Sequence, residues 1–215
     1  MPFFRYKDKT ILFIHVPKTG GSTIEEWIET FADINLLQNN PVIGENPYGM
    51  PEILPCTPQH LMQSEIDKYF ANRFDYIFTV VRNPYKRVES EFKFKQIIHK
   101  VLGTVPDQSF DEWVRTIGDQ FAHDPWARDN HLRPQHEFFD DRAKLFRFEE
   151  GLLNICRALS EDIEAPAPDD RLSHVLDGSA HNHEIVWSDE GRAHVKAFYR
   201  EDFSKFGYDP DVYPL

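Results

Sequence analysis

Residues 11–23 read Ile-Leu-Phe-Ile-His-Val-Pro-Lys-Thr-Gly-Gly-Ser-Thr. The apolar run 11–16 predicts a buried strand, because β-branched and aromatic residues favour a covered, pleated surface. An amphipathic helical pattern follows the glycines, and its expected apolar face consists of Ile24, Trp27, Ile28 and Phe31. A strand, a glycine turn and a helix in this order direct backbone N–H groups and a helix N-terminus toward an anion, usually a phosphate.

The loop differs from the standard nucleoside-triphosphate loop. That motif places its lysine after the glycines, whereas Lys18 precedes Gly20 and Gly21 here. A plain strand-to-helix turn is the alternative interpretation. A lysine, paired glycines and hydroxyl residues at a helix start favour a phosphate site over such a turn. The predicted anion-binding residues are Lys18, Thr19, Gly20, Gly21, Ser22 and Thr23.

Two further strand patterns, at 75–81 and 144–148, are each followed by a helical pattern. Strands that alternate with helices predict an α/β protein, with a P-loop-like three-layer fold and a mostly parallel central sheet flanked by helices. With 215 residues and no linker, the chain is expected to form a single domain over 1–215. One helix is expected to begin near residue 24. Further helices are expected over 64–70, 84 to about 100, 110–121, 149–159 and 188–206. Ser64 and Ser188 are the expected caps of the helices that they begin. Residues 33–59 are expected to form a surface excursion, and 122–137 an irregular segment.

Composition excludes several classes of protein. A formal net charge of −12 disfavours general nucleic-acid binding, which depends on summed basic charge. The sequence has no run long enough to span a bilayer and no apolar leader, so a cytoplasmic location without a membrane span is expected. The two cysteines and ten histidines show no metal-ligand spacing, and no metal is expected.

The second strand pattern ends in a basic residue. A kinase or ATPase of this architecture usually ends a later strand in an acidic residue that helps to hold magnesium, but Arg82 stands there instead. Ser90 lies about two turns along the following helix, so the guanidinium and the hydroxyl could hold one phosphate from two sides. A surface ion pair for Arg82 and a solvated Ser90 are the alternative. Together with the first loop, these residues indicate a ligand with phosphates at two places and a reaction supported by protein cations.

These segments resemble sulfotransferases that use 3′-phosphoadenosine 5′-phosphosulfate (PAPS). Residues 17–23 resemble the 5′-phosphosulfate loop of that family, and 81–90 resemble its 3′-phosphate segment, with Arg82 and Ser90 in the phosphate-binding places. The form His-Val-Pro-Lys-Thr-Gly-Gly-Ser is most similar to the carbohydrate sulfotransferases of the heparan 2-O and chondroitin type. In all, the resemblance covers residues 11–27, 76–92, 129–137, 144–151 and 180–208.

The resemblance implies roles for individual residues. Lys18 would stabilise the charge that develops on the leaving 5′-phosphate, and His60, placed like the family's catalytic histidine, is the preferred base. The other candidates for the base are His15, His131, His136, Glu25 and Glu26. Residues expected to recognise the acceptor are His131, Arg133 and Gln135. Asn182 and His183 are assigned to the PAPS cofactor, whose product would be adenosine 3′,5′-bisphosphate.

The acceptor is expected to be a hydroxyl group, most readily that of a saccharide or small glycoside. Two other functions remain as alternatives. An ATP-dependent kinase with a variant loop would require magnesium and would prefer ATP to PAPS. A non-catalytic nucleotide-binding domain would keep the fold without the chemistry.

Overall fold

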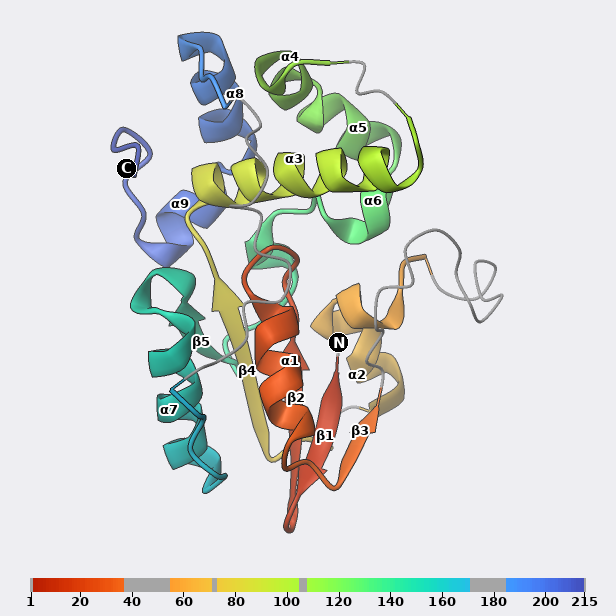
Figure 1. Ribbon diagram of the computed structural model, residues 1–215, viewed down its shortest axis with the longest axis vertical. Coiled ribbons are helices and arrows are strands. Elements are labelled where there is room, and N and C mark those ends of the chain that lie inside the picture. Colours follow the sequence, from red (N-terminus) through yellow and green to blue (C-terminus); the bar gives the residue numbers. More distant parts are fainter. Residues whose placement is uncertain (1, 37–54, 71–72, 105–107, 171–184, 215) are drawn as a thin grey trace.

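The computed structural model describes residues 2–36, 55–70, 73–104, 108–170 and 185–214 (Figure 1). The strands are β1 (Phe3–Tyr6), β2 (Lys9–Ile14), β3 (Ile34–Leu36), β4 (Tyr76–Val81) and β5 (Lys144–Arg147). The α-helices are α1 (Gly21–Glu29), α2 (Gln63–Phe70), α3 (Pro84–Val101), α4 (Phe110–Arg115), α5 (Ile117–His123), α6 (Ala127–Asn130), α7 (Leu152–Ile163), α8 (Asp189–Phe198) and α9 (Arg200–Phe206). Short 3-10 helices are η1 (Pro58–His60), η2 (Gln135–Glu137) and η3 (Phe148–Glu150).

One sheet joins the five described strands in the order β3-β1-β2-β4-β5. β2 and β4 are parallel, with Ile11 opposite Tyr76, and β4 and β5 are parallel, with Phe78 opposite Lys144. β1 is antiparallel to both of its neighbours, so it alone runs against the other four strands. The structure therefore confirms the α/β class with a mostly parallel sheet.

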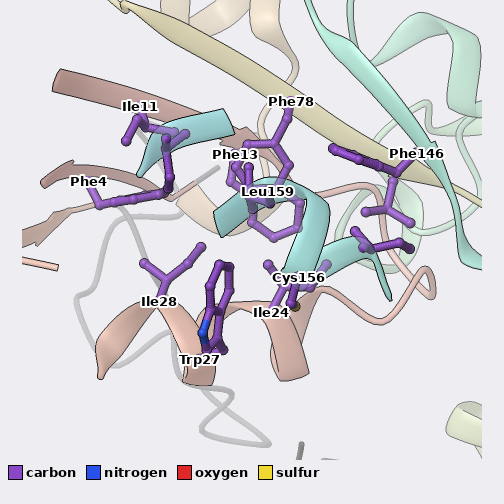
Figure 2. Packing of buried hydrophobic residues seen from close by; sticks show 13 residues of the cluster. Phe4, Ile11, Phe13, Ile24, Trp27, Ile28, Phe78, Phe146, Cys156 and Leu159 are labelled. Carbon is purple, nitrogen blue, oxygen red and sulfur yellow. The ribbon is translucent and has the colours of Figure 1, made fainter. Parts of the chain in front are cut away.

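Helices cover both faces of the sheet. Figure 2 shows the core on one face, where Phe13 and Phe78 of the strands meet α1 and α7 through Trp27 and Leu159. The opposite face packs against α2, the segment around Phe138 and α9. The expected apolar face of α1 is confirmed, because Ile24, Trp27 and Ile28 are buried there and Phe31 packs beside them.

A group of helices lies beyond the carboxyl ends of the parallel strands. In Figure 1, α3 crosses this end of the sheet, and α4, α5, α6 and α8 lie beyond it. Their apolar side chains, among them Tyr85, Trp113 and Tyr199, form a separate buried cluster. These helices cover the edge of the sheet at which ligands of α/β proteins usually bind. None of the helices in the described ranges combines the length and apolar character that a membrane crossing requires.

Several expected boundaries differ from the structure. The helix expected over 110–121 is two helices, because the chain turns at Thr116. The helix expected over 188–206 is likewise divided at Tyr199, although Ser188 caps its start as expected by accepting a hydrogen bond from Gly191 N. α2 begins at Gln63, so Ser64 lies inside the helix. The excursion at 33–59 contains β3 and the first two residues of η1, and residues 37–54 of it lie outside the described ranges.

Further boundaries differ after the third parallel strand. β5 ends at Arg147, and η3 separates it from α7, which begins at Leu152 and ends at Ile163. The segment expected to be irregular, 122–137, contains the short elements α6 and η2, although Arg128 and Asp129 within α6 have left-handed backbone angles. The long helix expected from Pro84 is confirmed as α3, with Pro84 in its first turn and the Asn83 side chain accepting a hydrogen bond from Tyr85 N.

Candidate active site

The loop between β2 and α1 has the geometry of an anion site. Lys18 and Gly20 have left-handed backbone angles, with φ of 70° and 84°. Glycine is needed at position 20, because a Cβ there would also lie 2.7 Å from a methyl group of Leu152. The Thr19 hydroxyl donates to Val16 O at 2.8 Å and closes the loop on itself. No side chain of the described residues caps α1, so the N–H groups of its first turn are available to a ligand.

His15 supports this loop from below. The ring packs so closely against Gly21 that a Cβ on residue 21 would overlap it. His15 Nδ1 lies 2.5 Å from Glu25 Oε1, and Gln59 Nε2 donates to Glu25 Oε2 at 2.8 Å. Burial alone would raise the pKa of Glu25, but the charge and hydrogen bond of His15, together with Gln59, lower it overall. Two candidates for the base, His15 and Glu25, are therefore paired with each other beneath the loop.

Arg82 connects the end of β4 to the loop. Its guanidinium donates from one terminal nitrogen to Lys18 O at 3.2 Å and lies 4.2 Å from the centre of the Phe148 ring. Arg82 Nε is buried and has no hydrogen-bond partner within the described ranges. Burial lowers the pKa of Arg82, while Glu149 opposes this shift. The two anion-binding elements predicted from the sequence are thus in direct contact.

Lys18 and Ser90, two of the predicted phosphate-binding residues, differ in their surroundings: Lys18 lies over an aromatic ring, whereas Ser90 has no hydrogen-bond partner among the described residues. Lys18 Nζ lies 4.1 Å from the centre of the Phe94 ring. Burial lowers the pKa of Lys18, Glu91 raises it and Arg82 lowers it further. The half-buried hydroxyl of Ser90 makes no hydrogen bond to any residue that the structure describes. Ser22 and Thr23 lie in the first turn of α1, so their N–H groups, like that of Gly21, belong to the uncapped N-terminus of the described helix.

His60 lies at the end of η1, in contact with the support of the loop. Its ring is nearly perpendicular to that of His15, with 5.2 Å between ring centres, and to that of His131, at 4.8 Å. His60 Nδ1 lies 2.8 Å from Asp129 Oδ2. Burial, together with the charges of His131 and His15, lowers the pKa of His60 to about 3. The hydrogen bond and charge of Asp129 oppose this shift but do not cancel it. His60 is therefore a neutral imidazole at ordinary pH.

His131 is the predicted acceptor residue that lies next to His60. Its Nδ1 is 2.6 Å from Glu91 Oε2, and its ring stacks on Phe94 with 5.6 Å between centres. Burial would raise the pKa of Glu91, but His131, Arg128 and Lys18 lower it to about 2. Because Lys18 lies over the same Phe94 ring, His131 and Lys18 share one wall of the site.

The other two predicted acceptor residues are engaged within the protein. Arg133 donates to Asn130 Oδ1 at 2.7 Å and to Glu137 Oε2 at 2.5 Å. Gln135 forms two hydrogen bonds with the backbone of Arg82, accepting from its N–H at 2.9 Å and donating to its C=O at 2.8 Å. Gln135 is therefore placed to hold the arginine in position. Asn182 and His183 lie outside the described residues.

His136, another candidate for the base, has both ring nitrogens next to carboxylates. Nδ1 lies 2.8 Å from Asp202 and Nε2 lies 3.0 Å from Glu201. The hydrogen bond to Asp202 raises the pKa of His136. Because both of its ring nitrogens already face carboxylates, His136 is less well placed than His60 to take a proton from an acceptor hydroxyl. Glu26, the remaining candidate, is exposed on α1.

Sequence reasoning missed two residues that organise the site. Asp129 pairs with His60, and Arg87 donates from Nε to Pro17 O at 3.0 Å and from a terminal nitrogen to His131 O at 2.7 Å. Asp129 is the first residue of the segment 129–137 to which the family resemblance extends, two positions before His131. That adjacency is its only sequence signal, because its partner His60 is 69 residues away.

One group of side chains has the composition of a metal site. His60, Asp129 and His131 offer ligand atoms that lie within 4.8 Å of one another. However, the Nδ1 atoms of both histidines already pair with carboxylates, Asp129 and Glu91 respectively. The structure thus shows two hydrogen-bonded pairs here, His60 with Asp129 and His131 with Glu91.

The carboxyl ends of the parallel strands thus bring together a helix N-terminus, a half-buried lysine and an arginine. This combination is typical of α/β proteins that bind anionic ligands. The chain belongs to the sulfotransferase family, whose family model matches residues 1–209. This membership confirms the predicted class of enzyme, and sulfuryl transfer is the reaction of that class. A crystal structure of a sulfotransferase from Alicyclobacillus acidocaldarius is similar, with 14% sequence identity, a TM-score of 0.47, and coverage of 91% of this chain and 92% of that chain. No curated protein sequence matches the chain significantly.

Proposed function

We propose that the protein transfers a sulfuryl group from PAPS to a hydroxyl acceptor, a saccharide or small glycoside, without a metal ion. The observation that carries this proposal is the hydrogen bond from Arg82 to Lys18 O. It brings two cationic elements from neighbouring strands to one place, as a nucleotide with phosphates at both ends of its ribose requires. Among the described residues, Arg82 Nε has no hydrogen-bond partner and no side chain caps α1, so both elements have donors left for the two phosphates.

The loop would hold the 5′ end of the donor. Lys18 and the N–H groups of residues 19–23 would contact the phosphosulfate, while Arg82 and Ser90 would hold the 3′-phosphate. The guanidinium of Arg82 lies over the Phe148 ring, 4.2 Å from its centre, and this contact helps to hold it in place. Asn182 and His183 are proposed as further contacts to the nucleotide.

The donor supplies an activated sulfuryl group and leaves as adenosine 3′,5′-bisphosphate. His60 is proposed to take the proton from the acceptor hydroxyl as the new S–O bond forms. The bridging S–O bond breaks, and its electron pair passes to the 5′-phosphate. Lys18 and the start of α1 would stabilise the charge that develops there. Fixed positions for both reactants supply much of the remaining acceleration, as in phosphoryl transfer.

A carbohydrate acceptor is supported by the resemblance of the loop to carbohydrate sulfotransferases. His131 is proposed to contact the acceptor, because it lies beside His60 and shares the Phe94 wall with Lys18. Arg133 and Gln135 would act on this side by holding the segment that carries His131. The net charge of −12 disfavours a highly sulfated polymer as acceptor.

Thermal unfolding with adenosine 3′,5′-bisphosphate, adenosine 5′-monophosphate and Mg-ATP tests the donor. A ligand at about 100 times its Kd adds about 2.7 kcal/mol, which should raise Tm by about 5 to 10 °C for a chain of this length. We expect this rise with the bisphosphate in the absence of metal, and a much smaller one with the other two nucleotides. A preference for Mg-ATP would refute the donor assignment and support the kinase alternative.

Two further measurements complete this test. Arg82→Gln should abolish the preference for the bisphosphate over the monophosphate, while the exposed Arg157→Gln on α7 should leave it unchanged. Transfer of labelled sulfate from PAPS to a panel of saccharides and small glycosides distinguishes an enzyme from a non-catalytic binding domain. Binding of the bisphosphate without transfer to any acceptor would support the passive domain.

A further inference from the structure

Asp129 makes three contacts that fix its carboxylate against His60. Oδ2 lies 2.8 Å from His60 Nδ1 and accepts a hydrogen bond from the Thr57 hydroxyl, also at 2.8 Å. Oδ1 accepts a hydrogen bond from Thr57 N at 2.6 Å. Burial would raise the pKa of Asp129, but the hydrogen bonds from His60 and from the Thr57 N–H lower it to about 2. Asp129 is therefore ionised and can act only as an acceptor.

An ionised partner determines which nitrogen of a neutral imidazole carries the proton. Because the Asp129 carboxylate can only accept, the proton of His60 must lie on Nδ1, and Nε2 is left with a free lone pair. The backbone of His60 is also fixed, since Asn130 Nδ2 donates to its carbonyl oxygen at 2.8 Å. Residues 129 and 130 thus hold both the ring and the main chain of His60.

The backbone that carries these contacts is strained. Arg128, Asp129 and Asn130 have φ of 56°, 57° and 66°, so three consecutive residues other than glycine are left-handed. Such conformations persist only where surrounding contacts enforce them, and they are concentrated at functional sites. The turn directs Asp129 toward His60, and Arg128 toward Glu91, whose Oε1 accepts a hydrogen bond from Arg128 Nε at 3.0 Å.

We infer that Asp129 is a positioning residue, which holds His60 as the Nδ1–H tautomer and directs its Nε2 toward the acceptor hydroxyl. This role rests on the proposed function, in which His60 is the base. In the transfer step, the acceptor proton passes to Nε2, and the imidazolium that forms is stabilised by the carboxylate at Nδ1. Asp129 itself stays ionised throughout the cycle.

The tautomer can be measured directly on the unliganded protein. Long-range ¹H–¹⁵N correlation spectra of histidine-labelled protein distinguish Nδ1–H from Nε2–H, and the signal of His60 is assigned by its absence in His60→Gln. We expect the neutral Nδ1–H form in the native protein at neutral pH. An Nε2–H form or an imidazolium at His60 would overturn the inference, whatever the behaviour of any Asp129 variant.

Asp129→Asn then tests the role in catalysis. Asparagine tolerates the left-handed backbone, and its single side-chain oxygen can still accept the hydrogen bond from Thr57 N. Its amide nitrogen then takes the place of Oδ2, where it can donate to Nδ1 and favour the wrong tautomer. We expect a mixed or reversed tautomer and a kcat lower by about 10- to 100-fold, since general-base catalysis contributes about 100- to 10,000-fold. KM for PAPS should not change. Asp141→Asn is the matched control, because Asp141 is fully exposed, and its ion pair with Lys205 is 3.9 Å long.

The outcomes separate this inference from the proposed function. If PAPS is a substrate and Asp129→Asn matches Asp141→Asn in tautomer and kcat, the positioning role is wrong and the proposed function stands. If adenosine 3′,5′-bisphosphate does not bind the native protein, the proposed function fails. The tautomer of His60 reports on the Asp129 contact independently of that result.

Discussion

Gly21→Ala should test how the loop is supported. A Cβ at residue 21 would come within 2.5 Å of His15 Cε1, and closer still to Nε2 and Cδ2. Ordinary carbon contacts are about 3.5 to 4.0 Å, so the ring or the start of α1 would have to move by about 1 Å. The ring cannot turn away freely, because Glu25 holds it at 2.5 Å and His60 packs against it.

Overpacking of this kind costs about 1 to 3 kcal/mol. For a chain of this length, we therefore expect Tm to fall by about 2 to 12 °C. Gly118→Ala is the matched control, because this helical glycine has 3.4 Å to its nearest neighbour, His194 Nε2. Alanine there should raise stability by about 0.4 to 1 kcal/mol, since it restricts the unfolded chain. Differential scanning calorimetry measures both variants.

A double-mutant cycle identifies His15 as the cause. In a His15→Ala background, Gly21→Ala should lower Tm much less, because the ring that it overlaps is gone. An equal loss in both backgrounds, or an unchanged Tm for Gly21→Ala alone, would refute the argument that His15 forms the floor of the loop.

Two further predictions concern catalysis. Lys18→Met keeps a long side chain over Phe94 but removes the charge, so transfer of labelled sulfate should fall by about 100- to 1,000-fold; an unchanged rate would contradict the role of Lys18. Burial, with the charges of His131 and His15, lowers the pKa of His60 to about 3 against the opposing effect of Asp129, so the proposed base stays neutral at pH values well below 6.5, the ordinary pKa of histidine. The pH profile of kcat/KM should therefore show no acidic limb near pH 6.5, and a limb there would show that His60 is not the base, or is not buried as described.

The parts of the fold that could be predicted have strong local signals. β2 and the start of α1 follow from an apolar run that ends in a proline and paired glycines. α3 follows from Asn83-Pro84, which combines a cap with a residue favoured in the first helical turn. Arg82 could be placed beside the loop because the carboxyl ends of parallel strands meet at one edge of a sheet.

Other parts have no such signal. β1 is only four residues long, too short for an alternating hydrophobic pattern to be recognised, and it forms by pairing with β2 in a hairpin. The helix breaks at Thr116 and Tyr199 lack a glycine or proline, and the apolar period continues across both. The pairing of His60 with Asp129 depends on a left-handed turn far along the chain, which local propensity does not predict. The internal engagement of Arg133 could not be seen either, since polarity alone suggests a binding residue.

Arg87 has a consequence for the chemistry. One buried guanidinium donates hydrogen bonds both to Pro17 O, at the start of the proposed phosphate loop, and to His131 O, on the side proposed for the acceptor. Under the proposed function, this single side chain therefore fixes the distance between the donor-binding loop and the acceptor-binding segment. In-line displacement tolerates little error in that separation, so Arg87 influences the rate without meeting either reactant. A lysine could not span both carbonyl groups with the same rigid fork, and the two halves of the reaction centre would drift apart.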